Sequence, residues 1–469
     1  MSEPNSRRSI SQKAHSRFQK VFSLTKEPLT DKQLTDAMNL NIITGTGAIL
    51  WYMVCFPGSL LNVFFKNYLG ASSFELGILV MISQLSAVLN LFSIILYSKC
   101  KTRKLPWFIF NIIHRCYAFL LAAGAIYVAR GGDHGIVIKA IIAGMAINWT
   151  LATLSTTGWW TWQTDLYPDK IRATFFGRRS AVLGLANMVA FFVVTIALDT
   201  IKFIDIYYVF AIFFTLAGIF GLADIVFHAL IPEPCPKIRT EFSWKNVFEP
   251  LRNRNFMRLV AGFGMFMFAS SIFSPFLAPY ITSSNDIGAP NTWLGVMFAV
   301  SLGAWICVAG RWGKIMDRFG RKGVIMIGCF SSVLWLGYIA LTPHNYFFVI
   351  PVIAILTGLF LTLTFESSNQ LMLTISPERN KMSYVAWFAT CNGLLGSIGS
   401  LAGGKISDVL KDLKYPLGAD FALNGFHVQV VLAVGLSLFG LIALRGIEEP
   451  QSRSMGFIVR WIVGNKKIV

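Results

Sequence analysis

The chain has 469 residues, of which 55% are hydrophobic and only 14% are charged, yet its formal net charge is +18. A soluble globular protein carries about a quarter charged residues, so this composition excludes an ordinary soluble enzyme or binding domain. Unbroken apolar stretches of roughly twenty residues recur, each long enough to cross about 30 Å of hydrocarbon. Strands of outer-membrane barrels are shorter, about ten residues of alternating polarity, so the pattern predicts an all-α polytopic membrane protein.

The apolar runs predict twelve transmembrane helices. They follow a basic tail over residues 1–39, which lacks the features of a cleavable signal peptide. A proline-rich connector over 232–256 separates six-helix bundles at 40–231 and 257–446, and a second basic tail covers 447–469. The predicted spans lie near 40–65, 74–97, 106–129, 137–163, 178–199, 204–230, 257–282, 292–309, 324–342, 347–373, 383–404 and 427–445.

Lysine and arginine gather on one side of the predicted spans. Most of the 41 basic residues fall in the two tails, the connector and the loops 98–105, 168–179 and 310–322. Since cytoplasmic loops carry the excess of Lys and Arg, both termini are expected in the cytoplasm, with the chain in the plasma or inner membrane. The charges are spread over separate loops without an aromatic-bearing soluble domain, so they favour contact with anionic lipid over nucleic acid.

The two six-helix segments repeat one another locally. Residues 69–77 read Leu-Gly-Ala-Ser-Ser-Phe-Glu-Leu-Gly, and residues 287–295 read Ile-Gly-Ala-Pro-Asn-Thr-Trp-Leu-Gly. The segments also end alike, with Ile-Pro-Glu-Pro at 231–234 and Ile-Glu-Glu-Pro at 447–450. Ordered matches of this kind indicate an internal duplication. The expected fold class is therefore two parallel six-helix repeats related by an axis along the membrane normal.

A glycine-rich basic motif follows the eighth span. Residues 313–322 read Gly-Lys-Ile-Met-Asp-Arg-Phe-Gly-Arg-Lys. This run resembles the G-x-x-x-D-R-x-G-R-K signature of the major facilitator superfamily, in the loop where the second half of that family carries it. Together with the spans and the repeat, the resemblance covers about residues 36–450. It implies the twelve-helix fold of that family and transport by alternating access.

The residues of this motif suit a gate. Glycines permit a tight turn between antiparallel helices, and a carboxylate at a helix end can face the positive N-terminus of a neighbouring helix. The resemblance implies that Asp317 contacts the eleventh span near Met382 and locks the cytoplasmic side in the outward-facing state. The gating candidates from this loop are Gly313, Asp317, Arg318, Gly320 and Arg321.

Further gating candidates lie in the first half and in two prolines. The loop that corresponds to the motif is degenerate, since Lys99 stands where the second half has its aspartate. Asp165, at the end of the fourth span, is expected to pair with Lys99 or Arg172, unless it only ends a helix in water. Pro57 and Pro275 occupy matching places in the first and seventh spans and are expected to bend both helices alike, as hinges.

Spans 1, 4, 7 and 10 carry the candidate substrate and coupling residues, because the resemblance places these spans around a central cavity. Polar side chains inside hydrocarbon need partners and therefore indicate a functional site. A carboxyl group in span ten can exchange a proton or bind a cationic group, or it can simply link helices. Adjacent tryptophans in span four cannot all face one way, so some anchor the interface and one can stack on a substrate ring. The candidates are Glu366, Asn369, Gln370, Asn148, Thr157, Trp159, Trp160, Tyr52 and Tyr280.

Charged and imidazole side chains also occur in spans three and six. His114 and Arg115 lie near mid-depth in span three, where an ion pair that braces the first half is the expected role. A buried arginine needs an anion, and Glu366 or an acidic substrate can supply it, so Arg115 is also a substrate-site candidate. Asp224 and His228, one helical turn apart in span six, are expected to serve packing.

The sequence thus predicts a secondary active transporter that moves a small polar or amphipathic organic solute, with a proton gradient as a candidate driving force. The alternatives are an exporter of amphipathic drugs or lipids, and a receptor or scaffold that does not transport. The sequence has no G-x-x-x-x-G-K-[ST] loop, H-E-x-x-H helix or C-x-x-C pair, so no ATP module, enzyme activity, cofactor or metal is expected. The expected partners are the small-molecule substrate and the lipid bilayer, with no nucleic acid, and the chain is expected to be a monomer.

Glu366→Gln is expected to abolish gradient-driven transport without loss of expression, because an amide cannot release a proton. Flux into proteoliposomes, measured across a range of pH, tests this expectation. If the variant keeps the pH dependence of the unaltered protein, Glu366 has no role in proton coupling.

Overall fold

The computed structural model describes residues 21–25, 27–236, 244–416, 422–450 and 452–464. Within these residues, twelve helices are long and apolar enough to cross a membrane, which confirms the predicted number of spans. In the first half they are Asp31–Tyr68, Ser73–Lys99, Lys104–Ala129, His134–Leu166, Lys170–Thr200 and Ile206–His228. In the second half they are Arg254–Thr282, Thr292–Phe319, Lys322–Ala340, Tyr346–Ile375, Lys381–Val409 and Gly425–Arg445.

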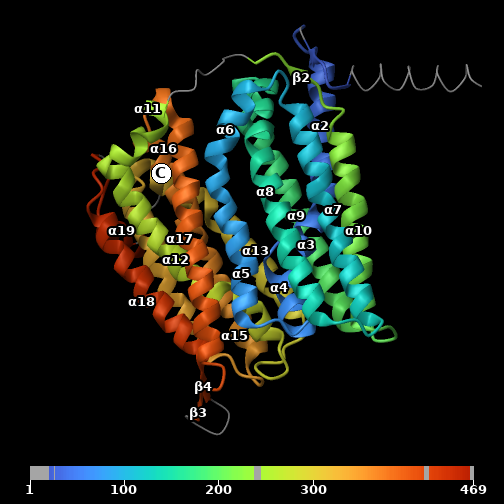
Figure 1. Cartoon of the computed structure of the whole chain (residues 1–469). Helices are drawn as coiled ribbons and strands as arrows, with labels where there is room; N and C mark the ends of the chain where they lie inside the picture. Colours follow the sequence, from blue (N-terminus) through green and yellow to red (C-terminus); the bar gives the residue numbers. More distant parts are fainter. Residues whose placement is uncertain (1–20, 26, 237–243, 417–421, 451, 465–469) are drawn as a thin grey trace, which may run out of the picture.

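Several spans contain more than one helical element (Figure 1). The first half contains β1 (Leu24–Thr25), α2 (Asp31–Gly47), α3 (Ile49–Cys55), α4 (Ser59–Val63), the π-helix η1 (Phe64–Tyr68), α5 (Ser73–Leu85), η2 (Ser86–Leu89), α6 (Asn90–Lys99), α7 (Lys104–Ala129), α8 (His134–Leu166), α9 (Asp169–Thr200) and α10 (Ile206–His228). The connector carries β2 (Glu233–Pro234), α11 (Trp244–Phe248) and η3 (Glu249–Arg252).

The second half contains α12 (Arg254–Thr282), α13 (Thr292–Phe319), α14 (Lys322–Phe330), η4 (Ser331–Ala340), α15 (Tyr346–Phe360), α16 (Thr362–Ile375), η5 (Glu378–Asn380), α17 (Lys381–Val409), β3 (Lys414–Pro416), β4 (Ala422–Asn424), α18 (Gly425–Arg445) and α19 (Met455–Val463). The strands are short. β1 pairs with β2 in parallel, and β3 pairs with β4 in an antiparallel hairpin.

The first helix begins at Asp31, inside the stretch predicted as a tail over 1–39. Thr30 accepts a hydrogen bond from the backbone N–H of Gln33, and the Gln33 side chain accepts one from Thr30 N at 2.9 Å. This capping box satisfies amides that a helix start leaves without partners, so polar residues ahead of the apolar run become helical.

The matched loops of the repeat fold alike. Gly70 and Gly288 have φ angles of 74° and 67°, a conformation that glycine adopts without a Cβ clash. A membrane-spanning helix begins shortly after each glycine, α5 at Ser73 and α13 at Thr292. The same turn at both places supports the duplication inferred from the sequence.

Two helix bundles lie side by side, one from each half (Figure 1). Across their interface α5 packs along α17, α9 contacts α13, and α4 contacts α12. The end of the molecule where residues 232–253 join the halves is called the connector end below. The opposite end, which holds β3 and β4 in Figure 1, is called the distal end.

A fully buried glutamate closes the first half at the connector end. Glu233 accepts hydrogen bonds from the backbone N–H groups of Arg103, at 2.8 Å, and Lys104, at 3.2 Å, where α7 begins. The Arg103 guanidinium also donates to Glu233 at 3.1 Å. The carboxylate therefore caps α7 and neutralises the arginine beside it.

The second half is closed in the same way. Glu449 accepts hydrogen bonds from the backbone N–H groups of Arg321, at 3.0 Å, and Lys322, at 2.8 Å, where α14 begins. Lys322 Nζ donates to the Ile447 carbonyl at 2.6 Å. The repeated sequences 231–234 and 447–450, at the ends of the two halves, thus bind the loops that precede α7 and α14.

Asp165 has a different partner from the predicted one. Arg103 Nη1 donates to Asp165 at 2.5 Å, so the prediction that Asp165 pairs with Lys99 or Arg172 is wrong. Arg172 Nη2 instead donates to the Tyr167 carbonyl at 3.0 Å, just beyond the C-terminus of α8. The reason is geometric, because Arg103 stands at the start of α7 within reach of the last turn of α8.

Of the two glycines in the signature loop, Gly313 and Gly320, only Gly320 lies in a turn. Gly320 has a φ angle of 82° and follows the last residue of α13, as expected for a glycine that reverses the chain. Gly313 lies inside α13, so its predicted role in the turn is wrong, because the helix continues through it to Phe319. The Arg318 guanidinium lies 5.5 Å from the Phe319 ring and 5.8 Å from that of Trp461, in α19. It therefore ties the loop to the surface helix.

Pro57 and Pro275 do not bend their helices alike. The first span breaks between α3 and α4, because Phe56, which precedes Pro57, is extended with a ψ angle of 140°. In contrast, α12 runs unbroken through Pro275 and Pro279. Pro279 has no N–H for the Pro275 carbonyl, and Asn62 of the other half donates to this carbonyl at 2.8 Å. The prediction of symmetric hinges is therefore wrong.

Glu233→Gln is expected to destabilise the fold by roughly 3–5 kcal/mol, because Asp165 then remains as the counter-charge for two buried cations, Arg103 and Lys104. Thermal unfolding of the purified protein measures this loss. Glu448→Gln is the matched control, since the Glu448 side chain is 82% exposed and its pair with Arg258, at 3.4 Å, is solvated. Equal melting temperatures for the two variants would contradict a structural role for Glu233.

Candidate functional site

A cavity of ≈390 Å³ lies inside the first half, between α2, α3, α7, α8, α9 and α10. Small-molecule sites typically enclose about 300–1,000 Å³, so the cavity suits a small solute. Its aromatic lining residues are Trp51, Tyr52, Trp107, Trp149, Trp159 and Trp160. Its polar lining includes Asn111, His114, Arg115, Arg179, Asp224 and His228.

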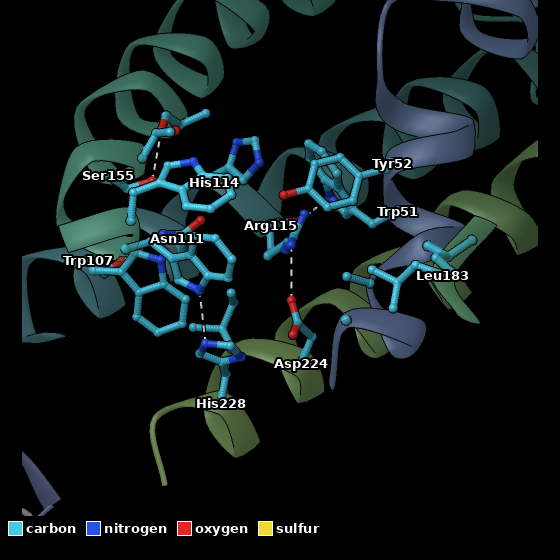
Figure 2. Close-up of a pocket in the computed structure, with 18 of the residues that line it drawn as sticks. Trp51, Tyr52, Trp107, Asn111, His114, Arg115, Ser155, Leu183, Asp224 and His228 are labelled. Carbon is cyan, nitrogen blue, oxygen red and sulfur yellow. Dashed lines mark hydrogen bonds and ion pairs between the residues drawn. The ribbon is translucent and has the colours of Figure 1, made fainter. Parts of the chain in front are cut away.

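An ion pair joins α7 to α10 in the wall of this cavity. Arg115 Nη2 donates to Asp224 Oδ2 at 3.0 Å, and the two side chains are only 3% and 7% exposed. Figure 2 shows the guanidinium between this carboxylate and the rings of Trp51 and Tyr52, which lie 4.7 and 4.6 Å from it. The Nε and Nη1 atoms of Arg115 have no hydrogen-bond partner in the described residues. Buried donors are normally paired, so these free N–H groups are unusual.

His228 is held in one tautomer. Trp159 Nε1 donates to His228 Nε2 at 2.9 Å, and an indole nitrogen can only donate. The ring proton therefore lies on Nδ1, which donates to Thr44 Oγ1 at 2.9 Å. Both ring nitrogens are used while the imidazole stays neutral. His228 thus fixes the orientation of Trp159 and adds no charge to the cavity.

Arg179 brings a second guanidinium to the cavity from α9. Its Nε donates to the Asn41 side chain at 2.7 Å, and its guanidinium lies 5.3 Å from the Trp159 ring. No carboxylate of the described residues lies within ion-pair distance of Arg179. The positive charge of Arg179 is therefore not neutralised by a direct partner.

Four predicted substrate residues meet in this cavity, namely Tyr52, Arg115, Trp159 and Trp160. Arg115 forms the ion pair within the first half that the sequence suggested, and its partner is Asp224. Asp224 and His228 are expected to serve packing; both side chains are buried and bonded to other side chains, and both also line the cavity.

Three other predicted residues lie elsewhere. Asn148 is buried behind the cavity wall, and its backbone carbonyl accepts a hydrogen bond from His114 Nδ1 at 3.2 Å. Thr157 faces α6, where its hydroxyl lies 2.5 Å from that of Ser93. Tyr280 is at the distal end, and its hydroxyl lies 3.0 Å from His427 Nε2. These residues therefore line no common site with Arg115.

Glu366, Asn369 and Gln370 lie on the exposed face of α16, in the second half. Thr364, on the opposite face, packs against Gly328 of α14. Glu366 forms no ion pair with the residues that the structure describes. Glu366 is exposed on the side of α16 away from α14 and lies outside the first-half cavity.

Arg179, Trp107 and Asn111 were missed by sequence reasoning. The sequence places Arg179 in the predicted basic loop 168–179, whereas in the structure α9 begins at Asp169 and Arg179 lies well inside this helix. A signal was present, since Leu183 follows Arg179 by one helical turn at the start of a long apolar run. Both side chains line the cavity from the same helix face.

Two aspartates join the halves at the distal end. Asp199, near the C-terminus of α9, accepts hydrogen bonds from the backbone N–H groups of Asn291, at 2.9 Å, and Thr292, at 2.7 Å, where α13 begins. Asp408, in α17, accepts from the first two backbone N–H groups of α5, each at 2.9 Å. In the register that pairs α9 with α17, these two aspartates are equivalent. Each half thus caps a helix of the other.

The signature aspartate makes no such contact at the connector end. The Asp317 side chain is 81% exposed, and its ion pair is with Arg321 of its own loop, 3.8 Å away. Between the halves α13 contacts α9, whereas α17 packs along α5. Asp317 therefore makes no contact with the eleventh span among the described residues, and the contact expected in the outward-facing state stays a prediction. Hydrogen bonds between the halves extend from the distal end to mid-depth, where Thr390 donates to the Ala87 carbonyl.

Known proteins resemble this chain in sequence. A family model described as Major Facilitator Superfamily matches residues 40–400 and 312–454. Multidrug resistance protein MdtG of Citrobacter koseri is 28% identical over 214 residues, which is 44% of this chain and 49% of MdtG. The uncharacterized MFS-type transporter YqjV of Bacillus subtilis is 30% identical over 24% of this chain and 27% of YqjV. The match thus spans about half the length of these curated relatives, or less.

Solved transporter structures resemble most of the chain in fold. The nucleoside transporter NupG superposes with a TM-score of 0.64 at 15% identity, over 88% of this chain and 98% of NupG. A D-xylose-proton symporter superposes with a TM-score of 0.65 at 12% identity, over 89% of this chain and 99% of the symporter. These similarities confirm the predicted fold class.

Replacing both distal aspartates, with Asp199→Asn and Asp408→Asn, is expected to loosen the distal contact, because charge-assisted hydrogen bonds are about twice as strong as neutral ones. Spin labels at Arg130→Cys and His344→Cys, on exposed loops of the two halves, report the separation. We expect longer distances in the double variant. Asp205→Asn is the control, since Asp205 caps α10 within its own half. Unchanged distances would contradict a clamping role.

Proposed function

Because this chain belongs to the major facilitator superfamily, we propose that it is a secondary active transporter that carries a small polar or amphipathic organic solute by alternating access. The placement of the contacts between the halves carries the proposal. Carboxylate caps hold the halves together at the distal end, whereas the signature aspartate at the connector end is free of the other half. One side of the molecule is thus clamped while the other is released.

The clamp is suited to a reversible motion. A hydrogen bond to a charged group contributes about 1.5–3 kcal/mol, and water can replace part of it at a half-buried site. Asp199 and Asp408 are half-buried, so opening the distal end exposes carboxylates that water can solvate. New interactions at the connector end must then offset the hydrogen bonds that break at the distal end. Asp317, exposed at the end of α13, is placed to make one of them.

The orientation follows from charge. The basic loops and the connector lie at the connector end, which we assign to the cytoplasm by the excess of Lys and Arg. Both termini are then cytoplasmic, and the structure corresponds to an inward-facing state of an integral membrane protein in the plasma or inner membrane. We further propose that the chain acts as a monomer, since each half supplies the contacts of the other.

Two observations bear on the driving force and on the direction of transport. Glu366 is an exposed carboxyl side chain on a membrane-spanning helix, a position that suits proton exchange. Export of amphipathic compounds is a second candidate, favoured by the aromatic lining of the cavity and by the multidrug resistance name of the relative MdtG. Both candidates require the same alternation of the two halves.

A cross-link across the distal end tests alternating access. Ser73 and Ser407 belong to different halves, and their hydroxyl oxygens lie 2.9 Å apart. In Ser73→Cys with Ser407→Cys, an oxidant is expected to stop solute flux into proteoliposomes, and a reductant is expected to restore it. A thermal-shift screen of nucleosides, sugars, amino acids and aromatic acids selects the solute. Each single-cysteine variant is the control for the native thiols.

Continued flux through the fully cross-linked protein would contradict alternation at this end. A solute that stabilises the protein yet never accumulates under a pH or solute gradient would favour a receptor over a transporter.

A further inference from the structure

Arg115 offers a binding site that its own fold does not fill. A guanidinium has five N–H donors; Asp224 accepts from Nη2, and the Tyr52 side chain also hydrogen-bonds the group. The Nε and Nη1 atoms are buried without a partner in the described residues, although the side chain lines a cavity large enough for a solute. A buried donor left unpaired costs free energy, about 1–3 kcal/mol. Both atoms have less than 1 Å² of accessible surface, so an acceptor atom of a ligand removes that cost once the side chain turns toward the cavity.

The charges of the cavity favour an anion. Its charged lining residues are Arg115, Arg179 and Asp224. Asp224 is already engaged by Arg115, and His228 is neutral because its Nε2 accepts from Trp159. One positive charge, that of Arg179, remains without a direct counter-charge in the described residues. A singly charged anion balances it, whereas a cation adds to the excess.

The remaining wall favours a flat apolar body on this anion. Tyr52 is 50% exposed and Trp160 is 51% exposed, and both line the cavity. Trp159 is held by the hydrogen bond from its Nε1 atom to His228, and its partly exposed ring is fixed in place, whereas Trp51, whose Nε1 atom donates to the Arg115 carbonyl, is fully buried and supports the wall. Fixed aromatic rings bind planar groups by stacking without further ordering.

We propose that the first-half cavity binds an amphipathic organic anion, a carboxylate attached to a flat apolar body, whose oxygens accept from the free N–H groups of Arg115. This proposal rests on the proposed function and names its substrate class. A phosphate monoester carries close to two charges and exceeds the single positive charge available.

Calorimetric titration of the full chain in lipid nanodiscs tests the proposal. The probes are naphthalene-2-carboxylate and indole-3-acetate, the uncharged carboxamide of each, and the cation 2-naphthylmethylammonium. Each carboxylate is expected to bind about tenfold or more tightly than its carboxamide, as a charge-assisted hydrogen bond in a buried site implies. The ammonium probe is expected not to bind.

Two variants separate binding from folding. Arg179→Gln removes the unbalanced charge at a half-buried position and is expected to reduce carboxylate affinity about tenfold. Arg115→Met with Asp224→Met removes the ion pair without leaving a buried charge alone, and it is expected to abolish the preference for carboxylate over carboxamide. Arg311→Gln, at an exposed position on α13, is the matched control and is expected to bind as the unaltered protein does.

Carboxamides that bind as tightly as carboxylates, tighter binding of the ammonium probe, or no measurable binding of either carboxylate would overturn the proposal. So would full carboxylate preference in the Arg115 and Asp224 double variant, since the pair would then only brace the helices. The outcome is independent of transport. Selective carboxylate binding without flux would refute the transporter and keep the site, whereas flux of another solute without carboxylate binding would refute the site alone.

Discussion

The contact on which this structure depends is a carboxylate at the N-terminus of a helix. The first amides of a helix have no partner within it, and at the ends of these spans a carboxylate supplies one. Glu233 and Glu449 supply that partner within each half, and Asp199 and Asp408 supply it between the halves. The internal duplication places the four contacts in two equivalent pairs.

Glu233 differs in burial from the two distal aspartates, and this difference separates a rigid contact from contacts that can move. Glu233 is fully buried and bonded to a buried arginine, so breaking this contact would leave a buried charge without this partner. Asp199 and Asp408 are half-buried, and water can reach both when the contact opens. Each bundle therefore keeps its internal shape while the distal contact between bundles can break and re-form.

The charged side chains within the spans are distributed less symmetrically between the halves than the helices are. The ion pair of Arg115 and Asp224 lies in the first half alone, since α18, the counterpart of α10, contains no carboxylate residue. The exposed carboxyl group of Glu366 lies in the second half. Duplication thus supplied a symmetric frame, and later divergence placed the Arg115–Asp224 ion pair in one half and the carboxyl group of Glu366 in the other.

The sequence by itself determined the number of spans, the repeat and the fold class, because hydrocarbon thickness sets the length of every apolar run. It also marked Tyr52, Arg115, Trp159 and Trp160, because aromatic and charged side chains within a span indicate either a functional site or an anchor at the membrane interface. Only the tertiary structure decided their partners. Which side chain meets Arg115, or which amides Asp199 caps, depends on the rotation of each helix about its axis and on packing between distant segments, and a local pattern of residues carries neither.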